Sequence, residues 1–432
     1  MLTRNPTSIL TAALTAREHL DILITTLTAN PTTDYSSTID PTTKRAILKA
    51  ARDISRAVQT PVENLFETVF GIYDWAALQA AVKLEIINHI GPMGGDAVSD
   101  EEVSKKIGKS QDHVHRILKL LAANDVVEET APGCWRRREM AEVMLHPVVG
   151  SFAGGMVGRL GHFPTTIGNW LEENPYPTKT FDCPFTRAMG ATFWEVLSAD
   201  PEEAARFGRG MEGLSNIDAS VPVIKEWLIK NGRTEGVFRD VGGGSGWIDE
   251  RLAPDFPDIT FEIQDINPQQ WAARSSSLPP SLHRQLTFTP HSFFTPQPPS
   301  PTPVIALLHR WILHDWANTD AIAIIRNIVP ALEQNPDAAY LINDNVLPDL
   351  GEWEPFEERS ARQFDLVMMS YFNAKERSRA MWERLLREAD ERLEIVGVTR
   401  EGGMAAMALI EVRLRKEEVK EEVKEEAKEA KE

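Results

Sequence analysis

The chain has 432 residues, which is too many for one ordinary hydrophobic core, so two domains are expected. Its composition is globular, with 42% hydrophobic and 25% charged residues, and a net charge of -18 argues against a nucleic-acid partner. Only two cysteines, an N-terminus without the apolar core of a signal peptide, and no run of roughly 18 apolar residues predict a cytoplasmic protein with neither a disulfide framework nor a membrane partner.

The N-terminal part of the chain has a helical pattern. Residues 1–60 are expected to form two helices on either side of a break rich in Pro, Thr and Ser, and residues 69–90 carry apolar side chains at helical spacing. Ser99 then begins a capping-box pattern with Glu102, two short amphipathic helices follow, and the segments "DVVEE" and "CWRRR" form a small hairpin. This order outlines a winged-helix unit, which can bind DNA or serve as a dimerisation module. The second of the short helices has few basic residues, which favours a packing unit, and we assign residues 1–150 to this N-terminal domain.

From Val237 the pattern changes to strands alternating with helices, which predicts an α/β, Rossmann-like doubly wound parallel sheet. The expected strands cover residues 237–241, 259–266, 303–313 and 338–347, and helices are expected over 247–254 and 321–332. Residues 393–414 would close the sheet as an antiparallel hairpin, and helices and loops rich in aromatic residues precede it over 150–220. The catalytic domain is assigned to residues 151–412. The repeating charged segment 413–432 is expected to be a helical or disordered tail without chemistry.

A glycine-rich loop follows the first of these strands and opens a helix. Without a Cβ, glycine lets backbone N–H groups approach a ligand closely at a helix N-terminus. The spacing is G-x-G-x-G rather than the dinucleotide pattern G-x-G-x-x-G, and Trp247 takes the place of the last glycine, so a ligand without pyrophosphate is favoured. Asp265 ends the next strand, where a carboxylate can accept both hydroxyls of a ribose. Loop and carboxylate together indicate S-adenosylmethionine, and the glycines concerned are Gly242, Gly243, Gly244 and Gly246.

Five motifs in a fixed order carry a family resemblance. "DVGGGSG", "IQDINP", "RWILHDWAN", "LINDNVLP" and "NAKERS" together resemble the cation-independent O-methyltransferases of the plant caffeic-acid type and their fungal secondary-metabolite relatives. The likeness covers residues 60–412. It implies a methyltransferase domain preceded by a winged-helix dimerisation domain, and a homodimer in which the N-terminal domain interlocks with its partner and lines the acceptor pocket.

The resemblance also implies which residues hold the cofactor. The backbone of Gly242–Gly244 would lie against its methionine arm, and Asp265 would bind the ribose. Arg310, at a position where the family often has Lys, would lie near the cofactor. The remaining cofactor candidates are Met211 and Ser215 on a helix between cofactor and acceptor, and His291, Ser292 and Phe293 near the adenine, where the family often has an Asp.

His314 matches the general base of this family. A phenol with a pKa of about 10 is a poor nucleophile at neutral pH, and an imidazole with a pKa of about 6.5 can take its proton as the oxygen attacks the sulfonium methyl. Asp344, where the family usually has Glu, or Glu376 would accept from the other ring nitrogen and orient the ring. A metal site formed with His309 is disfavoured because residues five apart share a helix face poorly and no ligand cluster is nearby, so no metal is expected.

The acceptor is expected to be a flat aromatic small molecule. Apolar and aromatic candidates for its pocket are also explained equally well by core packing, and the sequence does not decide between the two. Two other functions stay open: a pericyclase-like enzyme on the same fold that uses bound S-adenosylmethionine as a positive charge, and a winged-helix regulator that senses the cofactor. The pocket candidates are Phe163, Trp194, Trp311, Met368 and Phe372.

Overall fold

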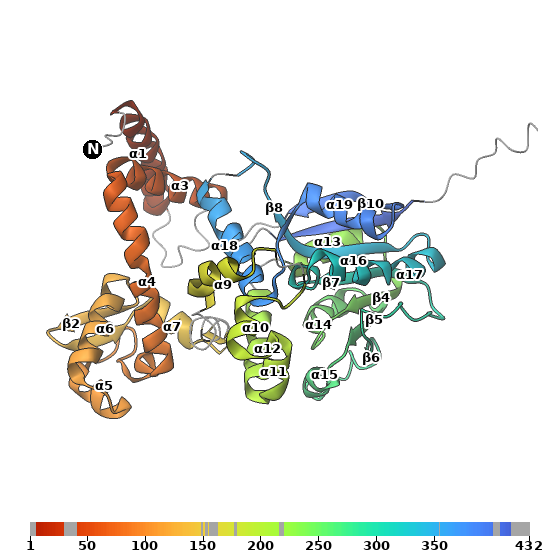
Figure 1. The fold of residues 1–432 in the computed structure, drawn as a ribbon, viewed down its shortest axis with the longest axis horizontal. Coiled ribbons are helices and arrows are strands. Elements are labelled where there is room, and N and C mark those ends of the chain that lie inside the picture. Colours follow the sequence, from red (N-terminus) through yellow and green to blue (C-terminus); the bar gives the residue numbers. More distant parts are fainter. Residues whose placement is uncertain are drawn as a thin grey trace, which may run out of the picture. The chain divides into compact units, whose positions relative to one another are not determined.

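A computed structural model describes most of the chain, in two compact units, Met1–Gly161 and His162–Glu432 (Figure 1). The sequence analysis placed the boundary between the domains after residue 150. The expected tail lies largely outside the described residues, and the last strand runs to Leu414. The described residues are 6–29, 41–147, 150–151, 154, 163–176, 179–215, 220–353, 355–400 and 407–415.

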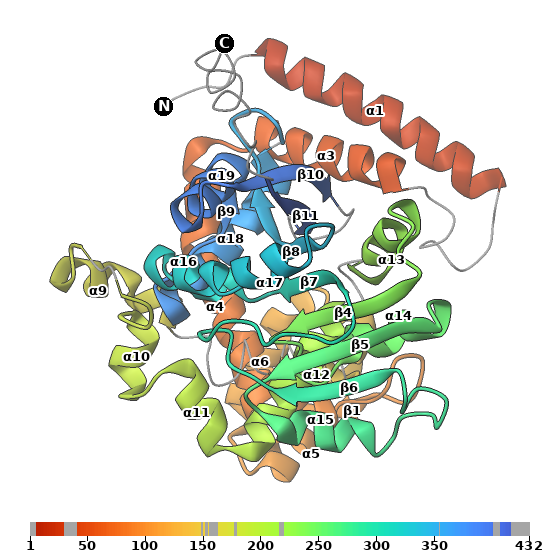
Figure 2. The ribbon, with the colours of Figure 1, turned by 90° about the vertical axis from the view of Figure 1, so that its right-hand side faces the viewer.

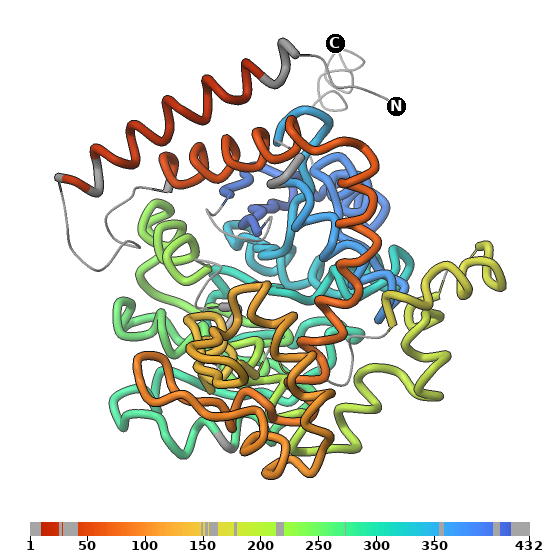
Figure 3. The backbone as a smooth tube through the Cα atoms, turned by 90° about the vertical axis from the view of Figure 1, so that its left-hand side faces the viewer, coloured from red at the N-terminus to blue at the C-terminus, as the bar shows by residue number. Residues whose placement is uncertain are grey.

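The first unit begins with a helical hairpin, as the sequence predicts. Helices α1 (Pro6–Ala29) and α3 (Pro41–Val58) lie side by side (Figure 3). Helix α4 (Pro61–Lys83) follows, and it starts with a capping box in which the Thr60 side chain accepts from the Glu63 N–H and the Glu63 carboxylate accepts from the Thr60 N–H.

One face of α4 exposes large apolar side chains in the single chain. Phe66 and Phe70 are stacked, with ring centroids 5.7 Å apart, and each is more than half exposed. An exposed apolar row of this length is larger than soluble monomers usually leave in water. We call this row the α4 face; it consists of Val62, Leu65, Phe66, Val69, Phe70, Ile72 and Tyr73.

The predicted winged-helix arrangement follows α4. Ser99 and Glu102 form the predicted capping box at the start of the first short helix. The predicted hairpin joins a third strand in a sheet of order β1-β3-β2. Trp135, Leu118 and Val103 are fully buried in its core. The elements are η1 (Ile86–His89), β1 (Val98–Ser99), α5 (Asp100–Ile107), α6 (Gln111–Ala123), β2 (Val127–Ala131), β3 (Cys134–Arg137) and α7 (Glu139–Leu145).

The second unit is built on a doubly wound sheet of order β10-β11-β8-β7-β4-β5-β6, which confirms the predicted fold class (Figure 2). Strands β6, β5, β4, β7 and β8 are parallel, and β11 and β10 continue the sheet antiparallel. A short strand, β9, pairs with the end of β8. The strands are β4 (Glu235–Val241), β5 (Asp258–Asp265), β6 (Leu286–Pro290), β7 (Val304–Arg310), β8 (Ala339–Leu347), β9 (Arg377–Ser378), β10 (Leu393–Arg400) and β11 (Met407–Leu414).

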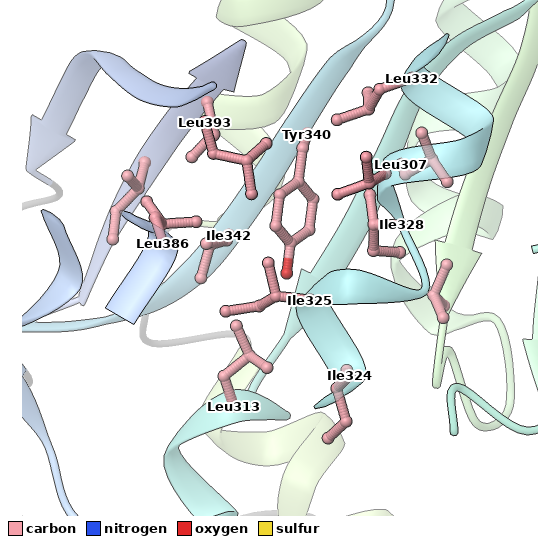
Figure 4. Close-up of a cluster of buried hydrophobic side chains, with 14 of the residues drawn as sticks. Leu307, Leu313, Ile324, Ile325, Ile328, Leu332, Tyr340, Ile342, Leu386 and Leu393 are labelled. Carbon is pink, nitrogen blue, oxygen red and sulfur yellow. The ribbon is translucent and has the colours of Figure 1, made fainter. Parts of the chain in front are cut away.

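Helices cover both faces of this sheet and bury its alternating apolar residues. On one face, Leu307 and Tyr340 pack against α16 and α19, and Figure 4 shows the Tyr340 ring among Leu307, Ile325 and Ile328. On the other face, α13 and α14 supply buried side chains. The helices of this unit are η2 (Phe163–Thr166), α9 (Ile167–Glu173), α10 (Pro184–Met189), α11 (Phe193–Ala199), α12 (Pro201–Ser215), α13 (Ser220–Lys230), α14 (Trp247–Leu252), η3 (Ala253–Asp255), α15 (Pro268–Ser275), η4 (Leu313–Asp315), α16 (Asn318–Arg326), α17 (Val329–Gln334), α18 (Pro355–Phe372) and α19 (Arg379–Ala389).

Two predicted elements differ from the structure. The strand expected over 303–313 ends at Arg310, because Trp311 adopts a left-handed backbone (φ 54°) and a 3-10 turn follows. The helix expected over 321–332 is split into α16 and α17, because Pro330 has no N–H to continue the first helix and suits the first turn of a second one. None of the helices within the described residues is long and apolar enough to span a membrane.

Candidate active site

The glycine loop follows the carboxyl end of β4, Asp265 ends β5, His314 follows the end of β7, and Asp344 lies in the second half of β8. In open parallel sheets, ligands bind at this edge, where the strand order reverses. β4 lies between β5 and β7, so the glycine loop after β4 stands at that reversal. The sheet therefore brings the loop, Asp265 at the end of β5 and the segment after β7 to one edge.

The glycine loop folds tightly against the end of β5. The N–H groups of Gly242 and Gly243 both donate to the Gln264 carbonyl, at 2.7 and 3.0 Å. Gly242 has φ 81°, and a Cβ added there would meet Ile312 Cδ1 at 2.7 Å. A Cβ on Gly243 would meet an Asp240 carboxylate oxygen at 2.5 Å. The positive φ at Gly242 and the contact with Asp240 at Gly243 therefore favour glycine at both positions, and the bare backbone of this loop allows close approach.

Asp265 is fixed by the same loop. Its Oδ2 accepts from the Gly244 N–H at 3.1 Å, and its Oδ1 accepts from the Asn267 N–H at 2.8 Å. Burial raises the pKa of Asp265. Each carboxylate oxygen has more than one acceptor site, so both can also accept from ligand hydroxyls in this position.

Two buried acids lie beneath the loop, and one of them was missed at the sequence level. Burial raises the pKa of Asp240 to about 6 and raises the pKa of Asp249 well above its usual value. The Asp240 carboxylate also interacts electrostatically with Arg310, whose Nε donates to Ser220 Oγ at 3.4 Å. Asp240 stands in the quoted motif "DVGGGSG", whereas nothing in the local sequence distinguished Asp249 from a surface acid of α14.

His314 lies in the short turn η4, which begins two residues after the left-handed Trp311. Its Nδ1 is 2.9 Å from Glu376 Oε1, and both side chains are buried. Trp311 packs edge-on against the imidazole, with ring centroids 5.3 Å apart, and the backbone N–H of Trp311 donates to the Asn343 carbonyl at 3.1 Å. The structure therefore brings His314, Glu376 and Trp311 together.

Three carboxylates surround the imidazole. Burial alone lowers the pKa of His314, but Glu376, Asp315 and Asp344 more than offset it and raise the pKa to about 10. Asp344 lies near the ring without a hydrogen bond to it, so Glu376 and not Asp344 is the hydrogen-bond partner of the imidazole. Sequence reasoning missed Asp315, whose Oδ1 is 3.5 Å from Nε2. Burial raises the pKa of both Asp315 and Asp344 to about 7, against the opposing effect of His314.

The other predicted cofactor residues occupy different positions around the edge. The backbone N–H of His291 donates to the Asp265 carbonyl at 3.1 Å, which places this segment beside the end of β5. Ser292 Oγ accepts from the Phe294 N–H within a turn, and Phe293 packs edge-on against Trp316. Met211 is half-buried on α12, and the side chain of Ser215 lies outside the described residues.

The aromatic pocket candidates fall into two groups. Trp311 contacts His314 directly, as described above. The others belong to a packed aromatic cluster around Tyr371, in which Phe163 is fully buried against Phe185 and Trp194 is stacked on Phe372 at 6.0 Å. Met368 is also buried, on α18. Within the described residues, no group of three or more His, Cys, Asp or Glu side chains is arranged to hold a metal ion.

Comparison with known proteins identifies the family to which the chain belongs. A family model described as "O-methyltransferase domain" matches residues 171–390, and one described as "O-methyltransferase dimerisation domain" matches residues 66–147. The chain is 30% identical over 371 residues to O-methyltransferase sol2 of Alternaria solani, which covers 85% of this chain and 84% of that protein.

Solved structures share the fold at lower identity. "A Pericyclic Reaction enzyme" has a TM-score of 0.73 and 21% identity, with 92% of this chain and 100% of that chain covered. The mitomycin 7-O-methyltransferase MmcR has a TM-score of 0.68 and 20% identity, with 85% and 99% covered. The names of these two proteins describe different reactions, so the shared fold does not decide the chemistry. The reaction has to be argued from the residues of the site.

Proposed function

Because the chain belongs to the O-methyltransferase family, we propose that it transfers a methyl group from S-adenosylmethionine to a phenolic hydroxyl of an aromatic small molecule, with His314 as the general base. The observation that carries this proposal is the buried pair of His314 Nδ1 and Glu376 Oε1, 2.9 Å apart, at the same sheet edge as the glycine loop and Asp265.

The glycine loop and Asp265 fit the cofactor. The loop leaves no space for side chains at Gly242 and Gly243, so its backbone can lie directly against the methionine arm. Asp265 is held by two backbone N–H groups in an orientation in which its oxygens can accept from both ribose hydroxyls. When bound, S-adenosylmethionine supplies a methyl carbon on a positively charged sulfur.

In the proposed reaction His314 takes the acceptor's proton. Its Nδ1 is 2.9 Å from Glu376, whereas its Nε2 has only the longer 3.5 Å contact with Asp315, so Nε2 is the atom that would take the proton of the acceptor hydroxyl. Glu376 fixes the ring and stabilises the imidazolium that forms. The surrounding carboxylates hold the pKa of His314 high in the absence of ligand, and a cation bound nearby favours the neutral imidazole that a base requires. Trp311 packs against the ring and limits its motion.

We further propose that the protein works as a homodimer through the α4 face. The matched dimerisation domain begins at residue 66, within that face. Seven large apolar side chains exposed on one helix would be unfavourable in water, and a second copy of the chain would bury them.

The two alternative functions have weaker support. A pericyclase has no need of a base, so the ordered pair of His314 and Glu376 favours methyl transfer. A DNA-binding regulator needs cationic side chains that are available to phosphates. The three consecutive arginines at the end of the hairpin β2–β3 instead pair with acids: Arg136 with Glu128, Arg137 with Glu142 and Arg138 with Asp125.

The test is product analysis with methyl-labelled S-adenosylmethionine. The purified protein is incubated with the labelled cofactor and an extract of its host, and the labelled product is identified. A labelled aromatic ether formed together with S-adenosylhomocysteine would support the proposal. Conversion of an extract component with the cofactor left intact would overturn it in favour of the pericyclase reading.

A further inference from the structure

Arg377 is a buried cation directly beside the glutamate that binds His314. It begins the short strand β9, where it pairs with Val346 at the end of β8, and its side chain is fully buried. Burial lowers the pKa of Arg377 to about 10, so the guanidinium is still charged at neutral pH. A buried charge is stable only when hydrogen-bond acceptors or opposite charges surround it, and the guanidinium of Arg377 has several such acceptors.

The guanidinium binds both ends of the turn that carries the base. Nη1 donates to the Leu313 carbonyl at 2.8 Å, and Nη2 donates to the Trp316 carbonyl, also at 2.8 Å. Nη2 also donates to Asn318 Oδ1 at 3.1 Å, and Nη1 makes a longer contact of 3.4 Å with the Lys375 carbonyl. Leu313 is the first residue of η4 and Trp316 its C-cap, so the two short contacts flank His314.

This turn depends on outside support. A three-residue 3-10 turn has poor internal hydrogen-bond geometry, and it follows Trp311, a bulky residue in the left-handed region. Besides Arg377, Thr180 Oγ1 accepts from the Ala317 N–H at 2.9 Å. The planar fork of arginine suits two acceptors at once, whereas a lysine ammonium is a single point donor.

We propose that Arg377 is a positioning residue for the base: its guanidinium fixes the His314 turn while the adjacent Glu376 fixes the imidazole. Two consecutive residues thus hold the backbone of the turn and the ring of the histidine that the turn carries. This inference rests on the proposed methyl transfer with His314 as base.

Arg377 also balances charge in the site. Removal of its positive charge leaves the acids around His314 with less compensation, which favours the imidazolium form. The charged groups that face His314 and Arg377 from the neighbouring elements are Asp315 of η4, Asp344 of β8, Asp365 of α18, and Glu376.

The experiment compares Arg377→Lys and Arg377→Gln with a matched control, Arg326→Lys. Arg326 also donates to two backbone carbonyls, those of Ala389 and Glu388 at 3.1 and 2.9 Å, but at the end of α19. For Arg377→Lys we expect kcat to fall by about tenfold or more, with the Kd of S-adenosylmethionine changed by less than about twofold. Arg377→Gln should in addition move the acid limb of the kcat profile to higher pH. Arg326→Lys should leave both kcat and its pH profile unchanged.

Hydrogen exchange gives a readout that does not depend on activity. The amides of residues 313–318 should exchange faster in Arg377→Lys than in the wild type, and should be unchanged in Arg326→Lys. Asn318→Ala removes one acceptor and keeps the buried charge, so it covers the case in which Arg377→Lys does not fold. It should lower kcat by a few fold and loosen the same amides.

The outcomes separate this inference from the proposed function. A wild-type protein that transfers no methyl group to any extract component would refute the proposed function alone, and the exchange data would still test Arg377. Unchanged exchange over residues 313–318 in the Arg377 and Asn318 variants would overturn the positioning role. A parallel loss of kcat and cofactor affinity would also overturn it, because a general structural defect predicts that result.

Discussion

Glu376→Gln tests the base assignment most directly, because it changes the charge of the side chain that binds His314 and little else. A hydrogen bond to a charged group contributes about 1.5–3 kcal/mol, and a neutral one about 0.5–1.5 kcal/mol. Exchange of the first for the second at the 2.9 Å contact removes about 1–1.5 kcal/mol, which is roughly a five- to thirteenfold loss of rate. This range is a lower bound, because the amide N–H can bind Nδ1 and favour the wrong tautomer.

The same substitution should shift the pH dependence in a known direction. Glu376 is the largest of the carboxylate effects that raise the pKa of His314 to about 10. Without this charge the pKa falls, and the neutral base is present at lower pH. Single-turnover rates of methyl transfer, measured from about pH 6 to about pH 10, should therefore show a lower plateau and an acid limb displaced to lower pH.

Glu383→Gln is the matched control. Glu383 lies on the exposed side of α19, where its carboxylate pairs with Arg379 at 3.0 Å, so both rate and pH profile should remain those of the wild type. A Glu376→Gln protein with the wild-type plateau, or with its acid limb displaced to higher pH, would refute the role given to Glu376.

Three other predictions follow from the same contacts. His314→Gln should lower the rate of methyl transfer by roughly 10²–10⁴ with little change in cofactor affinity. Folding raises the pKa of His314 from 6.5 to about 10, so its contribution to stability is complete below about pH 6.5 and is lost as the pH rises through about 10. The Tm of the cofactor-free wild type should therefore fall more steeply over this pH range than the Tm of the variant. Asp265→Ala should weaken S-adenosylmethionine binding by at least about tenfold in calorimetry, and wild-type affinity would mean that the ribose binds elsewhere. Phe66→Asp combined with Phe70→Asp should yield a folded monomer in sedimentation, whereas a dimer of unchanged stability would exclude the α4 face as the contact.

Most of the fold could be predicted because its pattern is local. Alternating strands and helices after Val237 indicate a doubly wound sheet, and a capping box at Ser99 marks the winged-helix unit. The prediction failed where one residue overrides an apolar run. Nothing in "VIALLHRWIL" shows that Trp311 turns into the left-handed region, and this turn is what takes His314 out of the sheet and into the site.

Residues within recognisable motifs could be assigned to the candidate site from the sequence. Contacts between distant chain segments could not be predicted. Gly242, Asp265 and His314 stand in recognisable motifs at strand ends, so the sheet topology brings them together. Glu376 rather than Asp344 is the hydrogen-bond partner because β9 pairs with β8. A strand of two residues is too short to be predicted from the sequence. Asp249 gave no signal because burial beneath the loop, and not residue type, makes it unusual.

The charges around His314 make sense as a response to the proposed reaction. Methyl transfer removes a positive charge from the cofactor side of the site, and the acceptor's proton places one on the imidazole. The protein must therefore stabilise a cation first beside His314 and then on it. Without ligand, Glu376, Asp315 and Asp344 hold the imidazole protonated and raise its pKa to about 10. A cofactor cation bound beside these acids would replace the positive charge that the imidazole gives up when it becomes the neutral base. In the proposed reaction the same acids thus stabilise the cation on the cofactor and then the cation on the imidazole, which accounts for three carboxylates around His314.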